Sequence, residues 1–365
     1  MRVLVANAGS SSLKLRLVAE SGEVDARLDL PAPGDPFDAA PLAAFVARSD
    51  PGAVGHRIVH GGPDLREPTL LDAAALERLA ALGDLAPLHN GPALRVLAAL
   101  REAASGLPHV ACFDTAFHAG IPDAAALYAL PRAWIERHDL RRYGFHGISH
   151  ARAARRAGEL LGRPLGELRL VTCHLGAGAS LAAVEDGRSV DTTMGFTPNE
   201  GLVMATRSGS VDPGLLLWLI RKGGVAPDAL EHALEHRAGL LGLSGTTGDM
   251  QELLLAANRD ERARVAIDVY VHRVRAGVAA MATSLGALDA LVFTGGVGEH
   301  APAVRAAVCA GLGFLGVGLD EARNRRRAGD EDLALPGSRV RVLAIESREE
   351  LEIARDVRSV LGAGV

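Results

Sequence analysis

Short, largely apolar runs alternate with longer amphipathic stretches along this chain. The short runs predict buried strands at residues 3–6, 56–60, 109–113, 168–174, 290–294 and 340–345. Apolar residues at helical spacing predict helices at residues 71–82, 151–161, 213–222 and 261–285. A Pro-rich segment at 31–51 predicts a surface connection with a short helix, and the charged segment 323–332 predicts a solvated loop. This alternation of strands and helices indicates an α/β fold.

The longest apolar stretch, residues 276–297, raises the question of a membrane span. Asp289 interrupts it, and the pattern changes there from an Ala-rich helix to a short strand. The stretch therefore predicts a buried helix followed by a strand. No membrane partner is expected.

Length, charge and cysteine content narrow the class of protein. A chain of 365 residues exceeds one ordinary core, so two domains are expected. A net charge of −5 with both signs interspersed argues against nucleic acid as a partner. Cys112, Cys173 and Cys309 lie far apart in apolar surroundings, which is typical of buried thiols in a reducing cytoplasm. Because Arg2 precedes only a short apolar run, no secretory signal is expected, and the expected location is cytoplasmic.

Three predicted strands run into turns of small residues: VLVANAGSSS near the start, LVTCHLGAGAS at 170–180 and LVFTGGVGE at 291–299. Glycine lets backbone N–H groups approach phosphates closely. The first turn adds hydroxyl groups and Lys14, which suit phosphate oxygens and a hard metal ion. By itself, the same pattern is also consistent with a polar hairpin that binds no ligand. Together the turns predict a nucleotide site.

Two other nucleotide motifs are excluded. The chain contains no GxxxxGK[ST] sequence, so it has no P-loop. Residues 311–316 fit GxGxxG, but a helix-like segment precedes them where a dinucleotide-binding turn needs a strand.

Several side chains are candidates for anion binding. Arg57 lies in a predicted strand that ends in paired glycines and is either an anion clamp or a structural strand-edge arginine. Asp114 follows another strand, where ligands of α/β sheets bind, although helix caps also occur there. His146 lies among glycines, in a predicted loop, where its ring could donate to a phosphoryl group. Arg207 lies in a long irregular stretch and is a second candidate clamp.

The paired histidines do not predict zinc. His56 and His60 are four residues apart in a strand, a separation of about 13 Å. His232 and His236 share a helix with alternating glutamates, which is typical of a solvated face.

With these residues in view, the chain resembles the acetate kinase family, including its propionate and butyrate kinase relatives, over almost its whole length. The matching motifs are VLVANAGSSSLK, GHRIVHGG, APLHN, FDTAFH, YGFHGISH, TCHLGAGAS, DTTMGFTPNEGLVMATRSGSVDPG, SGTTGDM, FTGGVGEH and REELEIARD. The resemblance implies two duplicated sheet domains of the sugar-kinase, actin and heat-shock-chaperone superfamily (ribonuclease H-like) around an interdomain cleft. The expected domains are residues 1–117 with 349–365, which include the C-terminal helix, and residues 118–348. A homodimer is expected on the same ground.

The resemblance also implies roles for the matched positions on the metal and nucleotide side. Asn7 and Glu349 would bind Mg²⁺, with Mn²⁺ as a substitute, and Ser10, Ser12 and Lys14 would face the phosphates. The nucleotide would be bound by His174, Leu175, Gly176, Ala177, Gly178, Asp249, Met250, Gln251, Gly296, Val297, Gly298, Glu299 and His300.

On the acceptor side, the resemblance implies that Arg57 anchors the substrate carboxylate. The alkyl end of the substrate would contact the apolar residues Val59, Leu88, Phe145 and Pro198. Asp114 would orient the carboxylate system or the neighbouring arginine, and His146 and Arg207 would stabilise the phosphoryl group in transfer. The expected reaction is the reversible, direct in-line transfer of the ATP γ-phosphoryl group to acetate, which gives acetyl phosphate and ADP.

This chain departs from the family pattern mainly on the nucleotide side. Ala177 stands where the family has Asn, Gln251 where it has Arg, and His300 where it has Asn. Ser210 replaces a usual Asp, and Ser347-Arg348 replace Thr-Asn before Glu349. Three alternatives follow: a propionate or butyrate kinase, an acetate kinase with another phosphoryl donor such as pyrophosphate, and a nucleotide-binding regulator without turnover. The third is disfavoured because the acceptor-side residues are retained together.

Overall fold

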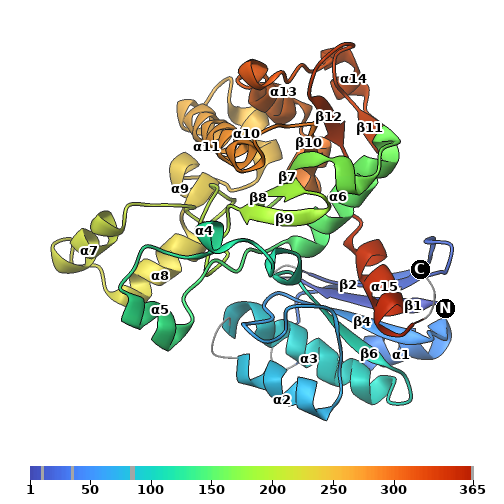
Figure 1. The fold of residues 1–365 in the computed structure, drawn as a ribbon. Coiled ribbons are helices and arrows are strands. Elements are labelled where there is room, and N and C mark those ends of the chain that lie inside the picture. The colour runs from blue at the N-terminus through green and yellow to red at the C-terminus, as the bar shows by residue number, and fades with distance from the viewer. Residues whose placement is uncertain (10–11, 34–36, 83–86, 363–365) are drawn as a thin grey trace. The chain divides into compact units, whose positions relative to one another are not determined.

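The computed structural model describes residues 1–9, 12–33, 37–82 and 87–362 (Figure 1). The chain divides into two compact units. Unit 1 comprises Met1–Ala119, Phe145–Arg152 and Arg348–Val365, and unit 2 comprises Gly120–Gly144 and Ala153–Ser347. The sequence analysis placed residues 145–152 in the second domain; in the structure this segment packs with unit 1, where the Gly147 N–H donates to the Asp114 carbonyl oxygen (2.8 Å).

Unit 1 is built on a six-stranded sheet in the order β3-β2-β1-β4-β6-β5. The strands are β1 (Val3–Ala8), β2 (Ser12–Val18), β3 (Val24–Pro31), β4 (Ala53–Ile58), β5 (Thr69–Leu70) and β6 (His109–Phe113). Strands β1, β4 and β6 run parallel, and the outer pairings are antiparallel.

Helices cover both faces of this sheet. They are α1 (Ala40–Ser49), α2 (Ala73–Ala81), α3 (Pro87–Ala103) and α15 (Glu349–Val360), with a 3-10 turn at η2 (Ala116–His118). Successive side chains of β1 point to opposite faces: Leu4 enters the cluster under α1 and α3, whereas Val5 packs with Ile353 of α15. A Cβ at Gly55 would lie 2.7 Å from Ile353 Cγ2, so the glycine lets α15 lie close against β4.

Unit 2 has a second six-stranded sheet in the order β11-β12-β10-β7-β8-β9. The strands are β7 (Arg169–Leu175), β8 (Ala179–Glu185), β9 (Arg188–Thr192), β10 (Ala290–Thr294), β11 (Glu331–Asp332) and β12 (Arg341–Ala344). Strands β7, β10 and β12 are parallel, and β8, β9 and β11 pair antiparallel.

The helices of unit 2 include α11 (Glu261–Leu285), which is 25 residues long and packs on β7 and β8. Asp260 caps its first turn and Gly286 ends it in a left-handed conformation (φ 66°). The other helices are α4 (Asp123–Ala126), α5 (Arg132–His138), α7 (Pro213–Arg221), α8 (Pro227–His236), α9 (Gly239–Ser244), α10 (Met250–Ala256), α12 (Gly295–His300), α13 (Pro302–Ala310), α14 (Glu321–Arg326), and the 3-10 turns η3 (Leu165–Glu167) and η4 (Gly313–Leu315). Helix α6 (Gly147–Leu161) begins in unit 1 and ends in unit 2.

The two sheets repeat one connectivity. In each, a three-stranded antiparallel meander is followed by two parallel strands and one short antiparallel edge strand, so β1-β2-β3-β4-β6-β5 correspond to β7-β8-β9-β10-β12-β11. The predicted α/β fold with duplicated sheet domains is confirmed. The shared topology also explains the echo between the first two Gly-rich turns, because each joins the first two strands of its sheet.

Some predicted elements need correction. The predicted helices did not include residues 87–103, but α3 begins at Pro87, a position where proline is favoured because its missing N–H has no partner in the first helical turn. Helix α6 begins at Gly147, ahead of the predicted start at 151, so His150 lies in the helix. The charged segment 323–332 holds the end of α14 and strand β11.

Two expectations about the class of protein can be compared with the structure, one about the cysteines and one about a membrane span. The cysteines Cys112, Cys173 and Cys309 are buried and free. Within the described ranges, none of the helices combines the length and apolar character needed to cross a bilayer.

Candidate active site

Arg57 and Asp114 meet at the carboxyl edge of the first sheet. Arg57 lies near the end of β4, and Asp114 directly follows the neighbouring parallel strand β6. The Arg57 guanidinium donates from Nε to Asp114 Oδ1 (3.0 Å) and from its terminal nitrogen to Oδ2 (2.6 Å). The Asp114 side chain is 1% exposed, so this is a buried, two-pronged ion pair.

Asn7 and Glu349 complete the same cluster from β1 and α15. Asn7 Nδ2 donates to Glu349 Oε2 (2.7 Å), while Asn7 Oδ1 accepts from Arg57 (3.1 Å). The Glu349 carboxylate also lies 3.8 Å from Arg57 Nε. We call Asn7, Arg57, Asp114 and Glu349 the acidic–arginine cluster. The structure thus brings together these four predicted site residues.

The electrostatics of this cluster follow from burial and charge pairing. Burial alone would lower the pKa of Arg57, but the Asp114 and Glu349 carboxylates outweigh it and raise that pKa above its ordinary value. Burial raises the pKa of Asp114, with Arg57 opposing and Glu349 adding to the rise. The Arg57 guanidinium therefore stays charged. It lies between the Asp114 and Glu349 carboxylates, and one of its terminal nitrogens donates to Asn7 Oδ1.

The segment at Phe145 and His146 also belongs to unit 1. Phe145 is buried, its carbonyl lies 3.1 Å from His118 Nε2, and its ring meets the edge of His60 at 5.5 Å between centroids. His146 adopts φ 57°, a left-handed conformation that is unusual for histidine. Because Gly147 is bonded to the Asp114 carbonyl, this strained residue is anchored next to the acidic–arginine cluster.

Two residues predicted to face phosphates, Ser12 and Lys14, lie in strand β2 of a hairpin. Gly9 N–H donates to the Ser12 carbonyl (2.8 Å), which closes the β1–β2 turn, and Ser12 begins β2. Lys14 is exposed and lies directly opposite Asn7 in the antiparallel register, so both side chains rise from the same face. Ser10 lies outside the described residues, as does the side chain of Leu88, whereas Val59 is half-buried just after β4.

In unit 2, two of the predicted nucleotide segments meet at the carboxyl edge of the second sheet. His174 pairs with Thr294 in the parallel register of β7 and β10, so the turn at Gly176–Gly178 lies beside the start of α12. Gly295 has φ 78°, and a Cβ there would lie 2.8 Å from the Leu175 carbonyl oxygen. A Cβ at the exposed Gly296 would meet nothing within 4 Å.

The third predicted nucleotide segment lies at the start of helix α10. Asp249 caps that helix by accepting from the N–H groups of Gln251 and Glu252 at 2.8 and 2.9 Å. It approaches the first segment through Ala205, whose N–H donates to the Ala177 carbonyl (3.0 Å) and whose carbonyl would lie 2.5 Å from a Cβ at Gly248. The His300 side chain is 77% exposed at the end of α12.

Arg207 and Pro198 are joined within the irregular segment between β9 and α7. The Arg207 terminal nitrogen donates to the Pro198 carbonyl oxygen (3.1 Å) and lies 3.6 Å from Met204 Sδ. Burial lowers the pKa of Arg207, with Glu235 opposing. The guanidinium nevertheless remains a cation near neutral pH, because arginine starts from a very high pKa.

The sequence analysis did not single out Arg305, which is 1% exposed. Its guanidinium donates to the carbonyls of Gly298 and Glu299, both at 2.8 Å, and to Asn324 Oδ1 at 2.7 Å. Arg305 therefore fixes the last turn of α12. The sequence feature that could have indicated a buried Arg305 is its place next to Val304 and three residues before Val308, on the apolar face of α13.

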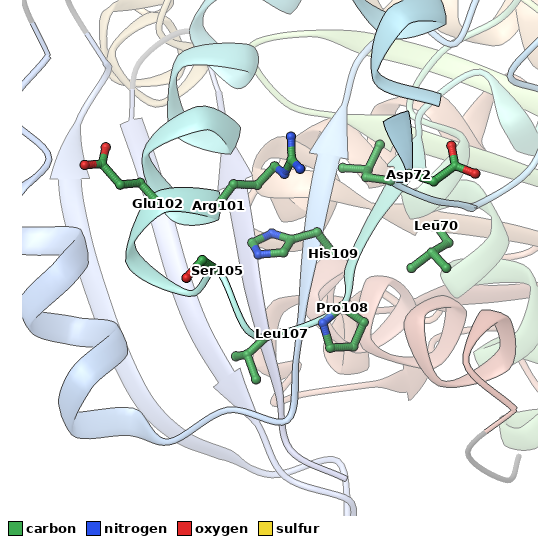
Figure 2. Close-up of a pocket in the computed structure, with 9 residues that line it drawn as sticks. Leu70, Asp72, Arg101, Glu102, Ser105, Leu107, Pro108 and His109 are labelled. Carbon is green, nitrogen blue, oxygen red and sulfur yellow. The ribbon is translucent and has the colours of Figure 1, made fainter. Parts of the chain in front are cut away.

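A pocket of about 500 Å³ lies at the opposite end of the first sheet (Figure 2). Its labelled side chains include Arg101, Asp72 and His109, and His109 begins β6 whereas Asp114 follows its end. None of the predicted site residues lines this pocket. Since ligands of parallel α/β sheets bind at the carboxyl ends of strands, the acidic–arginine cluster is the better candidate.

Fold and side chains together fit one class: a phosphotransferase with a carboxyl group as acceptor, built on two duplicated six-stranded sheets. The model of the Acetokinase family matches residues 45–355. The chain belongs to that family.

Individual relatives agree with this assignment. An acetate kinase of Gloeobacter violaceus is 52% identical over 306 residues, which cover 83% of this chain and 75% of the relative. The crystal structure of Porphyromonas gingivalis acetate kinase superposes with a TM-score of 0.90 at 34% identity and covers 99% of both chains. A propionate kinase from Francisella tularensis superposes with a TM-score of 0.89 at 34% identity and covers 97% of this chain and 98% of that one.

Proposed function

We propose that this protein is an acetate kinase that transfers the γ-phosphoryl group of ATP to acetate, reversibly and directly in line. The observation that carries the proposal is the acidic–arginine cluster, in which a charged guanidinium is fixed by Asp114 beside Asn7 and Glu349. The family assignment supplies the reaction class. The relatives described above include acetate and propionate kinases.

The chemistry of a carboxylate acceptor suits this set of side chains. Acetate has a pKa near 4 to 5, so it is already ionised at neutral pH and needs no strong general base. The main obstacle to the reaction is electrostatic repulsion between the acetate carboxylate and the γ-phosphate of ATP. Arg57 would bind the acetate carboxylate and Asp114 would hold Arg57 in place, while His146 and Arg207 would stabilise charge on the transferring group.

The apolar residues Val59, Leu88, Phe145 and Pro198 are proposed contacts of the acetate methyl group. Phe145 and Pro198 are buried, which makes them fixed surfaces. A longer acyl chain would need more room than a methyl group. A propionate or butyrate preference is therefore the alternative on the acceptor side.

Mg²⁺ fits the donor set at Asn7 and Glu349. An amide oxygen and a carboxylate are hard oxygen ligands, and Mg²⁺ in kinases commonly takes only one or two protein ligands together with substrate phosphates. The two side chains are adjacent, because the Asn7 amide nitrogen donates to Glu349 Oε2 (2.7 Å), while the Asn7 amide oxygen accepts from Arg57. When bound, the ion would neutralise charge on the phosphate oxygens.

The nucleotide is assigned to unit 2, where the half-buried Gly176 and Gly178 and the exposed Gly296 of α12 combine small residues with backbone N–H groups. Lys14 and the serines of the first hairpin are assigned to the phosphates. A second candidate, a donor other than ATP, is favoured by Ala177, Gln251 and His300. These three departures from the family pattern fall on the nucleotide side.

A matrix of donors and acids tests the proposal. Acyl phosphate formation is measured for acetate, propionate and butyrate, each with ATP, GTP and pyrophosphate. We expect acetate with ATP to give the highest kcat/KM, with activity lost on chelation of the divalent ion and restored by Mg²⁺. Preference for butyrate would overturn the acceptor assignment, and preference for pyrophosphate would overturn the donor assignment.

Two further proposals concern the state of the protein in the cell. Helix α7 has no buried residue and exposes Leu217 (50%) and Trp218 (56%), which supports the homodimer expected from the family. Light scattering on the purified protein tests this, since a monomer at micromolar concentration would contradict it. The three buried free cysteines support a cytoplasmic location.

A further inference from the structure

A polar network in unit 2 surrounds the segment that leads to Pro198. Tyr128 Oη donates to Glu200 Oε2 (2.5 Å) and accepts from the Phe196 N–H (2.8 Å). Arg142 donates to the other oxygen of Glu200 (2.8 Å), and its guanidinium lies 5.5 Å from the centre of the Tyr128 ring. We call Tyr128, Arg142 and Glu200 the loop clamp.

The loop clamp fixes consecutive peptide groups of this segment. Arg142 donates to the carbonyls of Thr193 and Met194 at 3.1 and 3.0 Å. The next carbonyl, that of Gly195, accepts from the N–H groups of Tyr143 and Gly144 at 3.1 and 3.3 Å. Every peptide carbonyl from 193 to 195 therefore has a partner, although the segment has no regular secondary structure.

The packing at Gly195 shows how closely the clamp contacts the backbone. A Cβ at that glycine would clash with both the Glu200 carboxylate and the Tyr128 hydroxyl. Burial and the Glu200 carboxylate raise the pKa of Tyr128 above its ordinary value, so the hydroxyl remains a donor. The segment has no room to shift toward the clamp, and its hydrogen bonds hold it from shifting away.

The same segment presents the Pro198 carbonyl to Arg207 (3.1 Å). Phe196, which the Tyr128 hydroxyl holds, precedes Pro198 by two residues. We propose that the loop clamp is a positioning assembly, which sets the place of Pro198 and, through its carbonyl, of the Arg207 guanidinium. It would thereby determine both turnover and the choice between acetate and longer acids. This inference rests on the proposed function, which gives Pro198 and Arg207 their roles.

Tyr128→Phe tests the inference because it keeps the ring under Arg142 and removes only the hydroxyl. The matched control is Tyr143→Phe, whose ring packs beside Phe196 (5.9 Å between centroids) but whose hydroxyl faces Asp139. Hydrogen exchange of the peptide spanning 193–200 is measured alongside kcat and KM for acetate, propionate and ATP.

We expect Tyr128→Phe to lower kcat at least about tenfold, since small misplacements of catalytic groups have large effects on rate. The ratio of kcat/KM for acetate over propionate should change by at least about threefold, a modest step on the scale of pocket discrimination. The KM for ATP should stay the same, and exchange at 193–200 should accelerate. Tyr143→Phe should match the wild type in all of these. Tyr128→Phe that also matches the wild type in kcat, acid preference and exchange would overturn the inference.

Failure of the proposed function gives a different result. A wild-type protein that phosphorylates no carboxylic acid would contradict the function, and unchanged exchange in Tyr128→Phe would still contradict the clamp. If Tyr128→Phe does not fold, Glu200→Ala and Glu200→Gln replace it. Loss of activity in the first with recovery in the second would support the clamp, because glutamine keeps an acceptor for Arg142. Equal activity in Glu200→Ala and Glu200→Gln would contradict the proposed role of the loop clamp.

Discussion

Arg57 and Asp114 form a two-pronged ion pair at 3.0 and 2.6 Å, although 57 residues separate them in the sequence. The pair is possible because β4 and β6 are adjacent parallel strands, whose carboxyl ends lie at one edge of the sheet. It places a cation where Asn7 and Glu349 converge. The account of function depends on this relationship.

Removing the charge of Asp114 should destabilise the fold. In Asp114→Asn the buried guanidinium loses its principal partner, and breaking one side of a buried pair costs about 3 kcal/mol or more. Urea unfolding measures this change in the free energy of unfolding. Asp29→Asn is the control, because the Arg16–Asp29 pair of the same sheet has a 57% exposed carboxylate and should contribute less than about 1 kcal/mol. Equal losses in the two variants would contradict the assigned role of burial.

Gly296→Ala should weaken nucleotide binding without harming the fold. An added Cβ meets nothing in the protein within 4 Å, so the free energy of unfolding should stay the same or rise by up to about 1 kcal/mol. If phosphates approach this glycine, the methyl group should raise the KM for ATP about tenfold, the effect of a crowded contact costing about 1.4 kcal/mol. Gly313→Ala, also open within 4 Å, is the control. Equal KM values for ATP in both variants would remove Gly296 from the nucleotide site.

Acid should destabilise unit 1 through His118. This ring is fully buried, and burial lowers its pKa to about 4, against a hydrogen bond to the Phe145 carbonyl. Unfolded histidine titrates near pH 6.5, so between about pH 6.5 and 4 the unfolded chain binds the extra proton and stability falls as pH falls.

The dependence of the unfolding free energy on pH isolates the contribution of His118. In His118→Gln the loss of unfolding free energy between pH 7 and 4 should be smaller than in the wild type by about 3 kcal/mol, at 1.36 kcal/mol per pKa unit. Denaturant melts at several pH values measure it. The control is His138→Gln, at an exposed histidine of α5, which should follow the wild-type pH profile. Parallel profiles for wild type and His118→Gln would show that the buried ring does not contribute.

Arg207→Ala should lose at least about 100-fold in kcat, the scale seen when one transition-state donor is removed. Steady-state turnover with saturating acetate and ATP measures it. Arg237→Ala, at an exposed arginine just after α8, should turn over normally. Near-normal turnover in Arg207→Ala would refute the role proposed for that guanidinium.

The sequence predicted some elements to the residue. Strands β6 and β10 matched because a buried parallel strand is apolar throughout, and α11 matched because Asp260 and Gly286 mark its ends. The start of α3 was missed because Pro87 suits both a loop and a first helical turn.

Sequence reasoning about the site was limited by distance along the chain. Asn7 and Glu349 are 342 residues apart, and only the family resemblance paired them. The loop clamp was missed for a similar reason. Tyr128 and Glu200 are 72 residues apart in segments without periodic pattern, so no spacing rule brings their side chains together.

The most direct test of the account is the KM for acetate in Arg57→Lys. Lysine keeps a positive charge but lacks the planar guanidinium, which binds Asp114 through one edge and is proposed to bind the substrate carboxylate through its terminal nitrogens. We predict that the KM for acetate rises at least about tenfold, equivalent to 1.4 kcal/mol, while the KM for ATP changes by less than about twofold. An unchanged KM for acetate, or a rise confined to the KM for ATP, would contradict the claim that Arg57 binds the substrate carboxylate.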